Sequence, residues 1–347
     1  MIRQSVDRAK VLSKNTAKVF RGLRQYLAGG EPDTDSWRAL LDLHCMTNGR
    51  STDIMTRVMR TVRPPKLSGA PYESLLGSVT PKKVNEIVED IRRDGYCVFK
   101  GRVPADICDG ITAASLRLEA RAGRKTDSKM MVFDPKNPIA PVYDVPERES
   151  IKIAEMQRLV ADPIFADVAE TYFRARSTIM NAALWWSPVM DGKPDTDAAQ
   201  LFHFDYDPAP IWLKFFVYLT DVTPTTGPHV FVRGSHRRQL PISKELLARH
   251  YVRIPDDEVE AVYGKENIID LTGPRGTVIA VDTLGFHKGK PPTTGNRLLA
   301  QIVLCTPLFV KLNGGTVPLP VDIVSELEEA LSQRPWVYER YRASQPE

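Results

Sequence analysis

Two patterns of apolar positions divide the chain. Apolar residues at helical spacing predict helices over 2–27, 35–43, 84–93, 105–122 and 323–331. Beyond residue 174, short apolar or alternating runs separated by Gly and Pro are typical of strands. Together with one short run nearer the N-terminus, they predict strands at 95–100, 177–187, 200–205, 211–219, 229–232, 277–281 and 298–306. We therefore expect a mainly β core, a sandwich or barrel, with flanking helices.

The breaks in this pattern suggest how the chain is organised. Pro64, Pro65, Gly69 and Pro71 interrupt it, and we place a linker there. The expected division is a helical N-terminal extension with linker (1–70), a β domain (71–320) and a helical tail (321–347). A content of 42% hydrophobic and 26% charged residues excludes wholesale disorder, a collagen-like fibre and a disulfide scaffold.

The positive charge of the chain is concentrated in the first helix. Residues 1–27 hold seven basic side chains and one acidic one, whereas the formal net charge of the whole chain is only +4. We find no basic stripe with interleaved aromatics on the rest of the chain, so nucleic-acid binding is not predicted. The basic amphipathic helix leaves three roles open: packing on the body, pairing with a second copy of the chain, and peripheral contact with an anionic membrane.

Cysteine usage and hydropathy bear on location. The four cysteines form no C-x-x-C pair and have no regular spacing, which indicates reduced thiols rather than bridges or a zinc site. No apolar run approaches the roughly 20 residues of a membrane span, and we see no apolar core of a signal peptide. We therefore expect a cytoplasmic protein without a transmembrane segment.

The candidate chemistry centres on two of the six histidines. His203 and Asp205 are two residues apart on a predicted strand, so their side chains should share a face. His287 follows the apolar run 277–281. Two histidines and one carboxylate leave three coordination positions open, as in non-haem Fe(II) oxygenases. Arg297, ten residues after His287, opens the next strand, and its planar fork of donors suits a dicarboxylate cosubstrate.

An isolated H-x-D is a weak signal, but the joint pattern resembles a known family. Residues about 82–310 resemble the phytanoyl-CoA dioxygenase family of Fe(II)/2-oxoglutarate-dependent oxygenases. The matching elements are His203-Phe-Asp205, Arg297 and the segments 216–228, 233–236 and 276–287. The resemblance implies a double-stranded β-helix (jelly-roll, cupin-like) core. It also implies that His203, Asp205 and His287 bind iron, and that Arg297 pairs with the distal carboxylate of 2-oxoglutarate.

Further residues are candidates for contacts around that site. Relatives place an amide side chain near the cosubstrate where Asn181 lies, and Lys214 could add a charge there. Trp186, Tyr206 and His229 are candidates for substrate contact. For Asn181 and Lys214 the alternative is an ordinary strand residue that faces solvent, and for the aromatic residues it is packing in the core.

Two positions depart from the family pattern. Arg233 replaces the usual proline of the turn, and His229 lies where the hairpin is usually apolar. His236 in the turn is expected to be structural, and His44 and His250 are expected at the surface. The segment 239–270 is either a lid or substrate wall, or surface decoration.

These observations predict an enzyme. We expect Fe(II), 2-oxoglutarate and O2 to be used to oxidise a C–H bond of a small organic molecule, with release of succinate and CO2. Because related halogenases lack the carboxylate ligand, Asp205 favours hydroxylation over halogenation. The alternatives are a metal-binding jelly roll without redox activity, a hydroxylase of a macromolecule, and a scaffold that acts through the N-terminal helix. No motif selects the substrate.

Overall fold

The computed structural model describes most of the chain. The described residues are 2–28, 32–47, 49–125, 127–190, 199–205, 212–237, 253–306 and 315–343. The predicted site residue Tyr206, the histidine His250 and residues 239–252 of the predicted lid therefore lie outside the described residues. None of the described helices is long and apolar enough to span a lipid bilayer.

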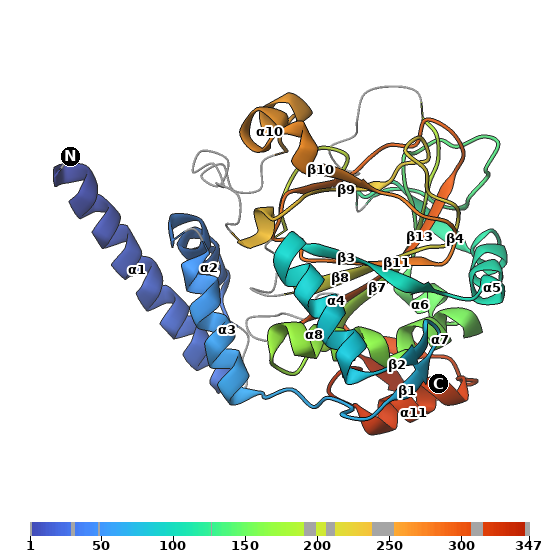
Figure 1. Cartoon of the computed structure of the whole chain (residues 1–347), viewed down its shortest axis with the longest axis horizontal. Coiled ribbons are helices and arrows are strands. Elements are labelled where there is room, and N and C mark those ends of the chain that lie inside the picture. The colour runs from blue at the N-terminus through green and yellow to red at the C-terminus, as the bar shows by residue number, and fades with distance from the viewer. Residues whose placement is uncertain are drawn as a thin grey trace.

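Three helices precede the β core: α1 (Ile2–Leu27), α2 (Thr34–Thr47) and α3 (Arg50–Val62) (Figure 1). The predicted helices at 2–27 and 35–43 are confirmed, whereas α3 was not predicted. The C-terminal half of α1 packs on α2, where Val19 is buried and Asn15 donates a hydrogen bond to Asp42. Packing is thus one role of the basic helix. The other two roles stay predictions.

The N-terminal helices also contact the body of the protein. His44 of α2 is buried rather than at the surface, because its Nδ1 lies 2.7 Å from Thr52 Oγ1 and its ring stacks on Phe204. After α3, the backbone N–H of Arg176 donates to the carbonyl of Arg63. The chain then runs without regular structure until a small hairpin of β1 (Tyr72–Ser74) and β2 (Gly77–Val79).

The core is built on an eight-stranded antiparallel sheet, the major sheet. In spatial order its strands are β3 (Tyr96–Arg102), β11 (Thr277–Val281), β8 (Trp212–Tyr218), β13 (Arg297–Cys305), β7 (Thr178–Ser187), β6 (Tyr143–Val145), β4 (Glu119–Ala122) and β5 (Met130–Val132). One prediction here was wrong in part. The helix expected over 105–122 ends at Ser115, because Arg121 and Ala122 instead pair with Asp144 and Tyr143 of β6.

A smaller sheet faces the major sheet and completes the double-stranded β-helix (Figure 1). This minor sheet has the order β10 (Ile268–Leu271), β9 (His229–Val232) and β12 (His287–Gly289). The strand predicted at 200–205 is not regular. Only single bridges form there, from Phe202 to Ile254 and from His203 to His287.

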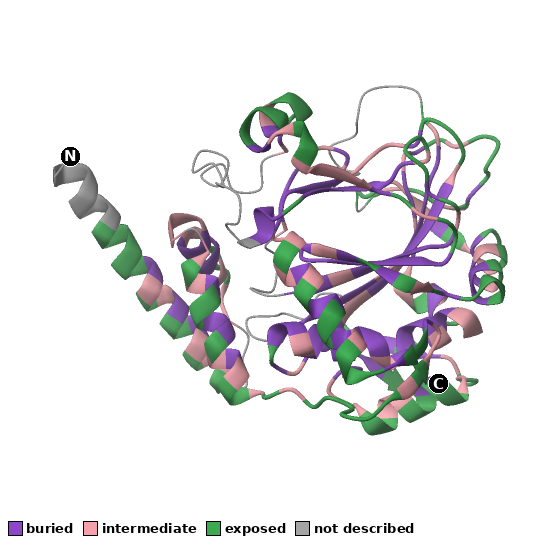
Figure 2. Cartoon of the chain, in the orientation of Figure 1, coloured by how far each residue is buried: buried purple, intermediate pink, exposed green. Residues whose placement is uncertain are grey.

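Helices cover the outer face of the major sheet: α4 (Pro81–Asp94), α5 (Ala105–Ser115), α6 (Glu147–Ser150), α7 (Ala154–Ala161) and α8 (Pro163–Phe173). The start of α4 is fixed by its sequence, since Thr80 Oγ1 caps the N–H of Lys83 and Pro81 occupies the first turn. Gly95, with φ of 89°, ends this helix in the left-handed conformation. Figure 2 shows buried residues concentrated in the two sheets and on the sheet-facing sides of these helices.

The remaining elements lie around this core. They are the 3-10 turns η1 (Ser235–Arg237) and η2 (Lys265–Asn267), the helices α10 (Asp256–Tyr263) and α11 (Ser325–Gln333), and the parallel pair β14 (Val317–Leu319) and β15 (Tyr341–Ala343). Within the predicted lid, the described part 253–270 thus holds α10, η2 and strand β10 of the minor sheet. The four cysteines are free thiols, as predicted.

Candidate metal centre

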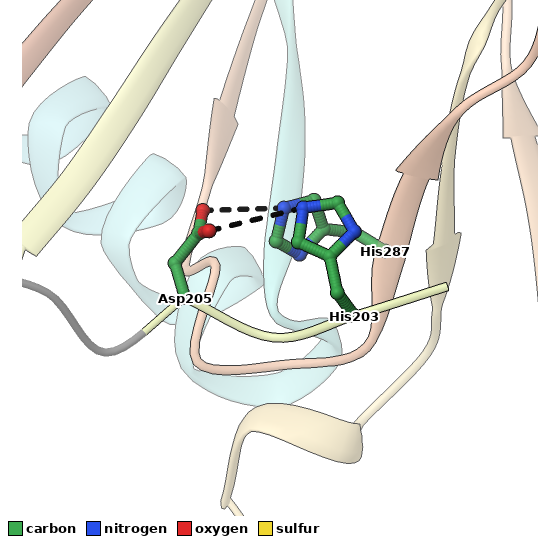
Figure 3. A group of neighbouring side chains, drawn as sticks. All are labelled: His203, Asp205 and His287. Atoms are coloured by element: carbon green, nitrogen blue, oxygen red, sulfur yellow. Dashed lines mark ion pairs between the residues drawn. The ribbon is translucent and has the colours of Figure 1, made fainter. Parts of the chain in front are cut away.

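Backbone pairing brings the predicted metal ligands together. His203 and His287 form an antiparallel bridge, with N–H to carbonyl distances of 3.0 and 2.8 Å in the two directions. The N–H of Asp205 donates to the carbonyl of Thr283 at 2.7 Å, in the loop that leads into β12. The side chains of His203, Asp205 and His287 consequently point toward one another (Figure 3).

The geometry of these three side chains fits one metal ion. Asp205 Oδ1 lies 3.8 Å from His203 Nε2, and Asp205 Oδ2 lies 3.3 Å from His287 Nε2. All three ligand atoms lie within 4.8 Å of one another. A single ion at about 2.0–2.2 Å from each atom would satisfy such spacings. Among the residues described, this is the one His/Cys/Asp/Glu group with that property.

Two carbonyl contacts orient both imidazoles toward the centre. His203 Nδ1 lies 2.8 Å from the Leu201 carbonyl, and His287 Nδ1 lies 2.9 Å from the Gly285 carbonyl. Because a carbonyl only accepts, each Nδ1 carries the proton and each Nε2 presents its lone pair to the centre. Burial lowers the pKa of His203 to about 3, so this ring is neutral at physiological pH.

Asp205 is held as an anion. Burial alone would raise its pKa, but Lys214 and then His287 more than offset that effect and hold the pKa well below its usual value. Lys214 Nζ lies 2.6 Å from Asp205 Oδ2. The sequence analysis predicts that Lys214 adds a charge near the cosubstrate. In the structure its ammonium group pairs with the Asp205 carboxylate of the candidate metal centre. An ionised carboxylate beside the neutral His203 imidazole suits the binding of a divalent cation.

Arg297 is buried, and no acidic side chain among the described residues pairs with it. It is the first residue of β13, paired with Ser187 of β7, and is 6% exposed. Nη2 donates to Ser187 Oγ at 3.1 Å, whereas Nε has no partner among the described residues. Burial lowers the pKa of this guanidinium to about 10, which still leaves it charged. A carboxylate, which only accepts hydrogen bonds, fits such a site.

One cavity of about 1210 Å³ between the two sheets joins these groups. It is lined by the three candidate ligands, by Arg297 and Lys214, and by further residues of both sheets that include Asn181, Trp185, Ser187, Phe216, His229 and Gln301. The metal-binding end and the carboxylate-binding end therefore open into the same space.

Comparison with known proteins decides the family. The model of the phytanoyl-CoA dioxygenase family (PhyH) matches residues 91–298, which is more than half of the chain and contains both the three candidate ligands and Arg297. The chain belongs to the phytanoyl-CoA dioxygenase family. The resemblance inferred from the motifs is thereby confirmed, and so is the jelly-roll core. Iron and 2-oxoglutarate are the cofactors of this family of oxygenases.

Individual relatives are distant. The ectoine dioxygenase of Sphingopyxis alaskensis is 28% identical over 213 residues, which is 56% of this chain and 66% of that protein. A crystal structure of EctD from S. alaskensis with bound Fe has a TM-score of 0.48 at 21% identity and covers 76% of this chain and 95% of that one. The epimerase SnoN, in complex with Fe3+, alpha ketoglutarate and nogalamycin RO, has a TM-score of 0.45 at 20% identity and covers 65% and 84%.

In this member of the phytanoyl-CoA dioxygenase family, the predicted substrate residue Trp186 lies on the face of β7 that points away from the cavity. Trp186 does not line the cavity: its Nε1 donates to Ser115 Oγ at 3.2 Å and its ring stacks on Phe133, on the opposite face of β7. Its neighbour Trp185 faces the cavity instead. The sequence contains a signal for this assignment. Residues 181 and 185 are an even number of positions apart, so their side chains lie on the same face of the strand.

Asn181 lines the cavity far from Arg297. It pairs with Val303 of β13, which also pairs with Lys214, so Asn181 and Lys214 lie in one row across the sheet. Arg297 pairs with Ser187, six residues along β7, a separation of about 20 Å. Asn181 is therefore near the Lys214 end of the cavity, away from Arg297.

His229 lines the cavity beside the metal centre. Its ring stacks on His287, with centroids 5.3 Å apart, and packs at a tilt against Phe216, with centroids 4.6 Å apart. The sequence singled out this histidine as unusual for its position but gave no partner for it.

Proposed function

We propose that this protein is an Fe(II)/2-oxoglutarate-dependent dioxygenase that hydroxylates a C–H bond of a small organic molecule. The overall reaction converts the substrate, O2 and 2-oxoglutarate to the hydroxylated product, succinate and CO2. One observation carries the proposal: an anchored His-Asp-His group and a buried arginine without a counter-charge line the same cavity.

The residues present fit both cofactors. His203, Asp205 and His287 would hold the iron, which when bound supplies the reduction of O2 coupled to decarboxylation of 2-oxoglutarate. The carbonyls of Leu201 and Gly285 orient the two imidazoles. Arg297 would bind the distal carboxylate of 2-oxoglutarate, with two donors in one plane. We assign no side-chain acid or base, because hydrogen abstraction from carbon does not require one.

The cavity supports a small molecule rather than a macromolecule as substrate. Sites for small ligands commonly enclose about 300–1,000 Å³. The 1210 Å³ found here has room for 2-oxoglutarate and for a second molecule beside it. The curated relative, an ectoine dioxygenase, supports the same class of substrate.

The test begins with the cofactors, because it needs no knowledge of the substrate. Fe(II) and 2-oxoglutarate are added to metal-free protein without oxygen, and the visible spectrum is recorded. We expect a metal-to-ligand charge-transfer band that is lost in His203→Ala and weakened in Arg297→Ala. His44→Gln is the matched control, because that histidine bonds Thr52 and does not line the cavity.

Oxygen is then admitted, and the release of succinate is followed with candidate small molecules. Iron binding without the band would favour the metal-binding jelly roll that lacks redox activity. A protein that binds no iron would refute the proposed function altogether.

A further inference from the structure

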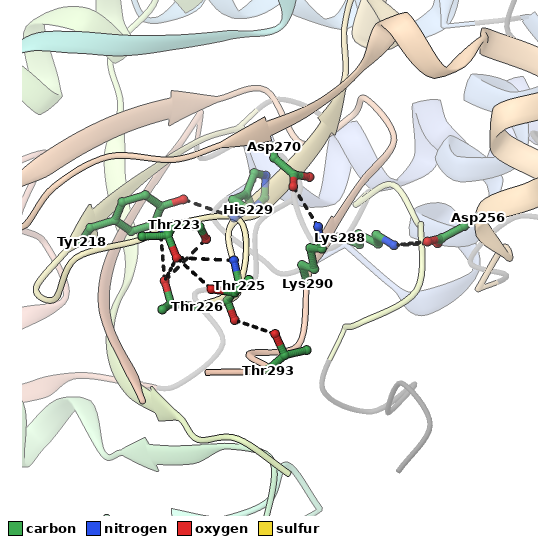
Figure 4. Close-up of polar contacts among 10 residues, drawn as sticks. All are labelled: Tyr218, Thr223, Thr225, Thr226, His229, Asp256, Asp270, Lys288, Lys290 and Thr293. Carbon is green, nitrogen blue, oxygen red and sulfur yellow. Dashed lines mark hydrogen bonds and ion pairs between the residues drawn. The ribbon is translucent and has the colours of Figure 1, made fainter. Parts of the chain in front are cut away.

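His229 is held rigidly at the wall of the cavity. It is the first residue of β9, which is the central strand of the minor sheet and pairs with Leu271 on one side and Gly289 on the other. Its backbone N–H donates to Tyr218 Oη at 3.2 Å (Figure 4), and that hydroxyl donates to the Leu271 carbonyl. The ring lies against His287 of the same sheet and Phe216 of the opposite sheet, and the residue is 5% exposed.

His229 and Arg297 both line this cavity, and each carries one buried nitrogen atom. His229 Nε2 and Arg297 Nε are both buried, and neither has a hydrogen-bond partner within the described ranges. An arginine Nε–H only donates. When imidazole Nε2 carries the proton it donates as well, and in that tautomer the two groups cannot satisfy each other. Strand register places the two side chains at the same end of the cavity. The His229 backbone lies beside Tyr218 Oη, and Tyr218 pairs with Leu299, two residues from Arg297 on β13.

A carboxylate is the group that would satisfy both nitrogens. Its two oxygens offer about four lone-pair sites, enough for Arg297 and for one further donor. Leaving a buried polar group without a partner is unfavourable, so a ligand that supplies an acceptor gains affinity there. Of the two ends of 2-oxoglutarate, the keto-acid end is directed to the metal, and the distal carboxylate is directed to Arg297.

We propose that His229 Nε2 donates a hydrogen bond to the distal carboxylate of 2-oxoglutarate, beside Arg297. This inference rests on the proposed function and adds a cosubstrate-binding residue to it. His229 would contact the cosubstrate itself and thus act on its affinity.

The test compares two ligands on the intact protein loaded with Ni(II). 2-Oxobutyrate has the same keto-acid end as 2-oxoglutarate but lacks the distal carboxylate. Calorimetry gives the dissociation constants of both for the wild type and for His229→Leu, His229→Gln and Arg297→Met. We expect His229→Leu to weaken 2-oxoglutarate binding about tenfold or more and to leave 2-oxobutyrate binding nearly unchanged. His229→Gln, which keeps a donor, should recover much of the loss, and Arg297→Met should show the same selectivity.

Three results would overturn the inference. The first is wild-type affinity of His229→Leu for 2-oxoglutarate. The second is an equal loss for both ligands, and the third is a fall in Ni(II) affinity measured without any keto acid. The last two would mean that the ring only positions His287. A wild-type protein that binds Ni(II) but not 2-oxoglutarate would instead refute the proposed function, and this inference with it.

Discussion

Arg297 and Arg340 are both buried, but their surroundings are opposite. Arg340 is 3% exposed and pairs with Glu147, with Nη2 2.9 Å from Oε2, while its other donors reach the carbonyls of Gly315 and Met180. Within the described part of the chain, Arg297 has only the Ser187 hydroxyl as a hydrogen-bond partner. Replacing each by methionine keeps an apolar stem of similar length and removes the charge. The two substitutions should therefore change stability in opposite directions.

The structure gives the magnitude. Burial lowers the pKa of Arg297 from 12.5 to about 10, which corresponds to about 3 kcal/mol of destabilisation of its charged form. Loss of the hydrogen bond to Ser187 lowers the stability by about 1 kcal/mol, which offsets part of this gain. Without cofactors, Arg297→Met should thus be more stable than the wild type by about 2 kcal/mol. Arg340→Met leaves the Glu147 carboxylate without its charge partner and should be less stable by about 3–5 kcal/mol.

Urea unfolding of the metal-free protein measures both effects. Repeating the titration with Ni(II) and 2-oxoglutarate should stabilise the wild type by about 2.7 kcal/mol at one hundred times the dissociation constant. Arg297→Met should gain only the part contributed by the metal. If this variant is less stable than the wild type without cofactors, or gains as much from 2-oxoglutarate, then Arg297 is not an uncompensated charge that awaits a carboxylate.

Three further predictions concern pH and the walls of the site. Because burial depresses the pKa of His203 to about 3, its contribution to stability is complete above about pH 6.5 and is lost as the pH falls toward 3. Urea unfolding of the metal-free protein should show a loss of about 1.4 kcal/mol of unfolding free energy per pH unit in that window. An unfolding free energy that does not change with pH there would contradict the buried, neutral state of His203. Trp186→Ala should cost about 3–5 kcal/mol of unfolding free energy because it empties a packed site, whereas Trp185→Ala, which borders the cavity, should cost clearly less; equal costs would refute the assigned faces. A Cβ on Gly285 would clash with the Phe231 ring, so Gly285→Ala should displace the carbonyl that orients His287 and weaken Ni(II) binding in calorimetry. The control Gly289→Ala, whose added Cβ has its nearest neighbour at 3.8 Å, should bind Ni(II) like the wild type.

Parts of the site could be predicted because their determinants are local. His203 and Asp205 are two residues apart, and the apolar run before His287 is a strand in the structure as well. The long strands β7, β8 and β13 were also predicted, because their apolar runs are long and bounded by turn residues. Arg297 at the head of β13 followed from that strand assignment.

Other parts depend on partners that the local sequence does not contain. Alternation along β7 indicates that Trp185 and Trp186 lie on opposite faces, but only the packing of helices on one face decides which of them meets the cavity. Residues 119–122 have good helix formers and become β4 because β6 offers them a pairing edge. Glu147 and Arg340 are 193 residues apart, and no pattern connects them.

The bridge between His203 and His287 has a consequence for how the protein discriminates between ions. Mutual backbone hydrogen bonds and the two carbonyl anchors fix the separation of the imidazoles before any cation arrives. The conformational entropy of the two rings is thus lost during folding and not during metal binding. In this respect the pair is similar to a rigid chelator. We therefore expect this pair to bind and release a cation without unfolding of the protein. Because the distance between the two Nε2 atoms does not adapt to the radius of the ion, we expect a large cation such as Ca²⁺ to bind less well than a smaller one.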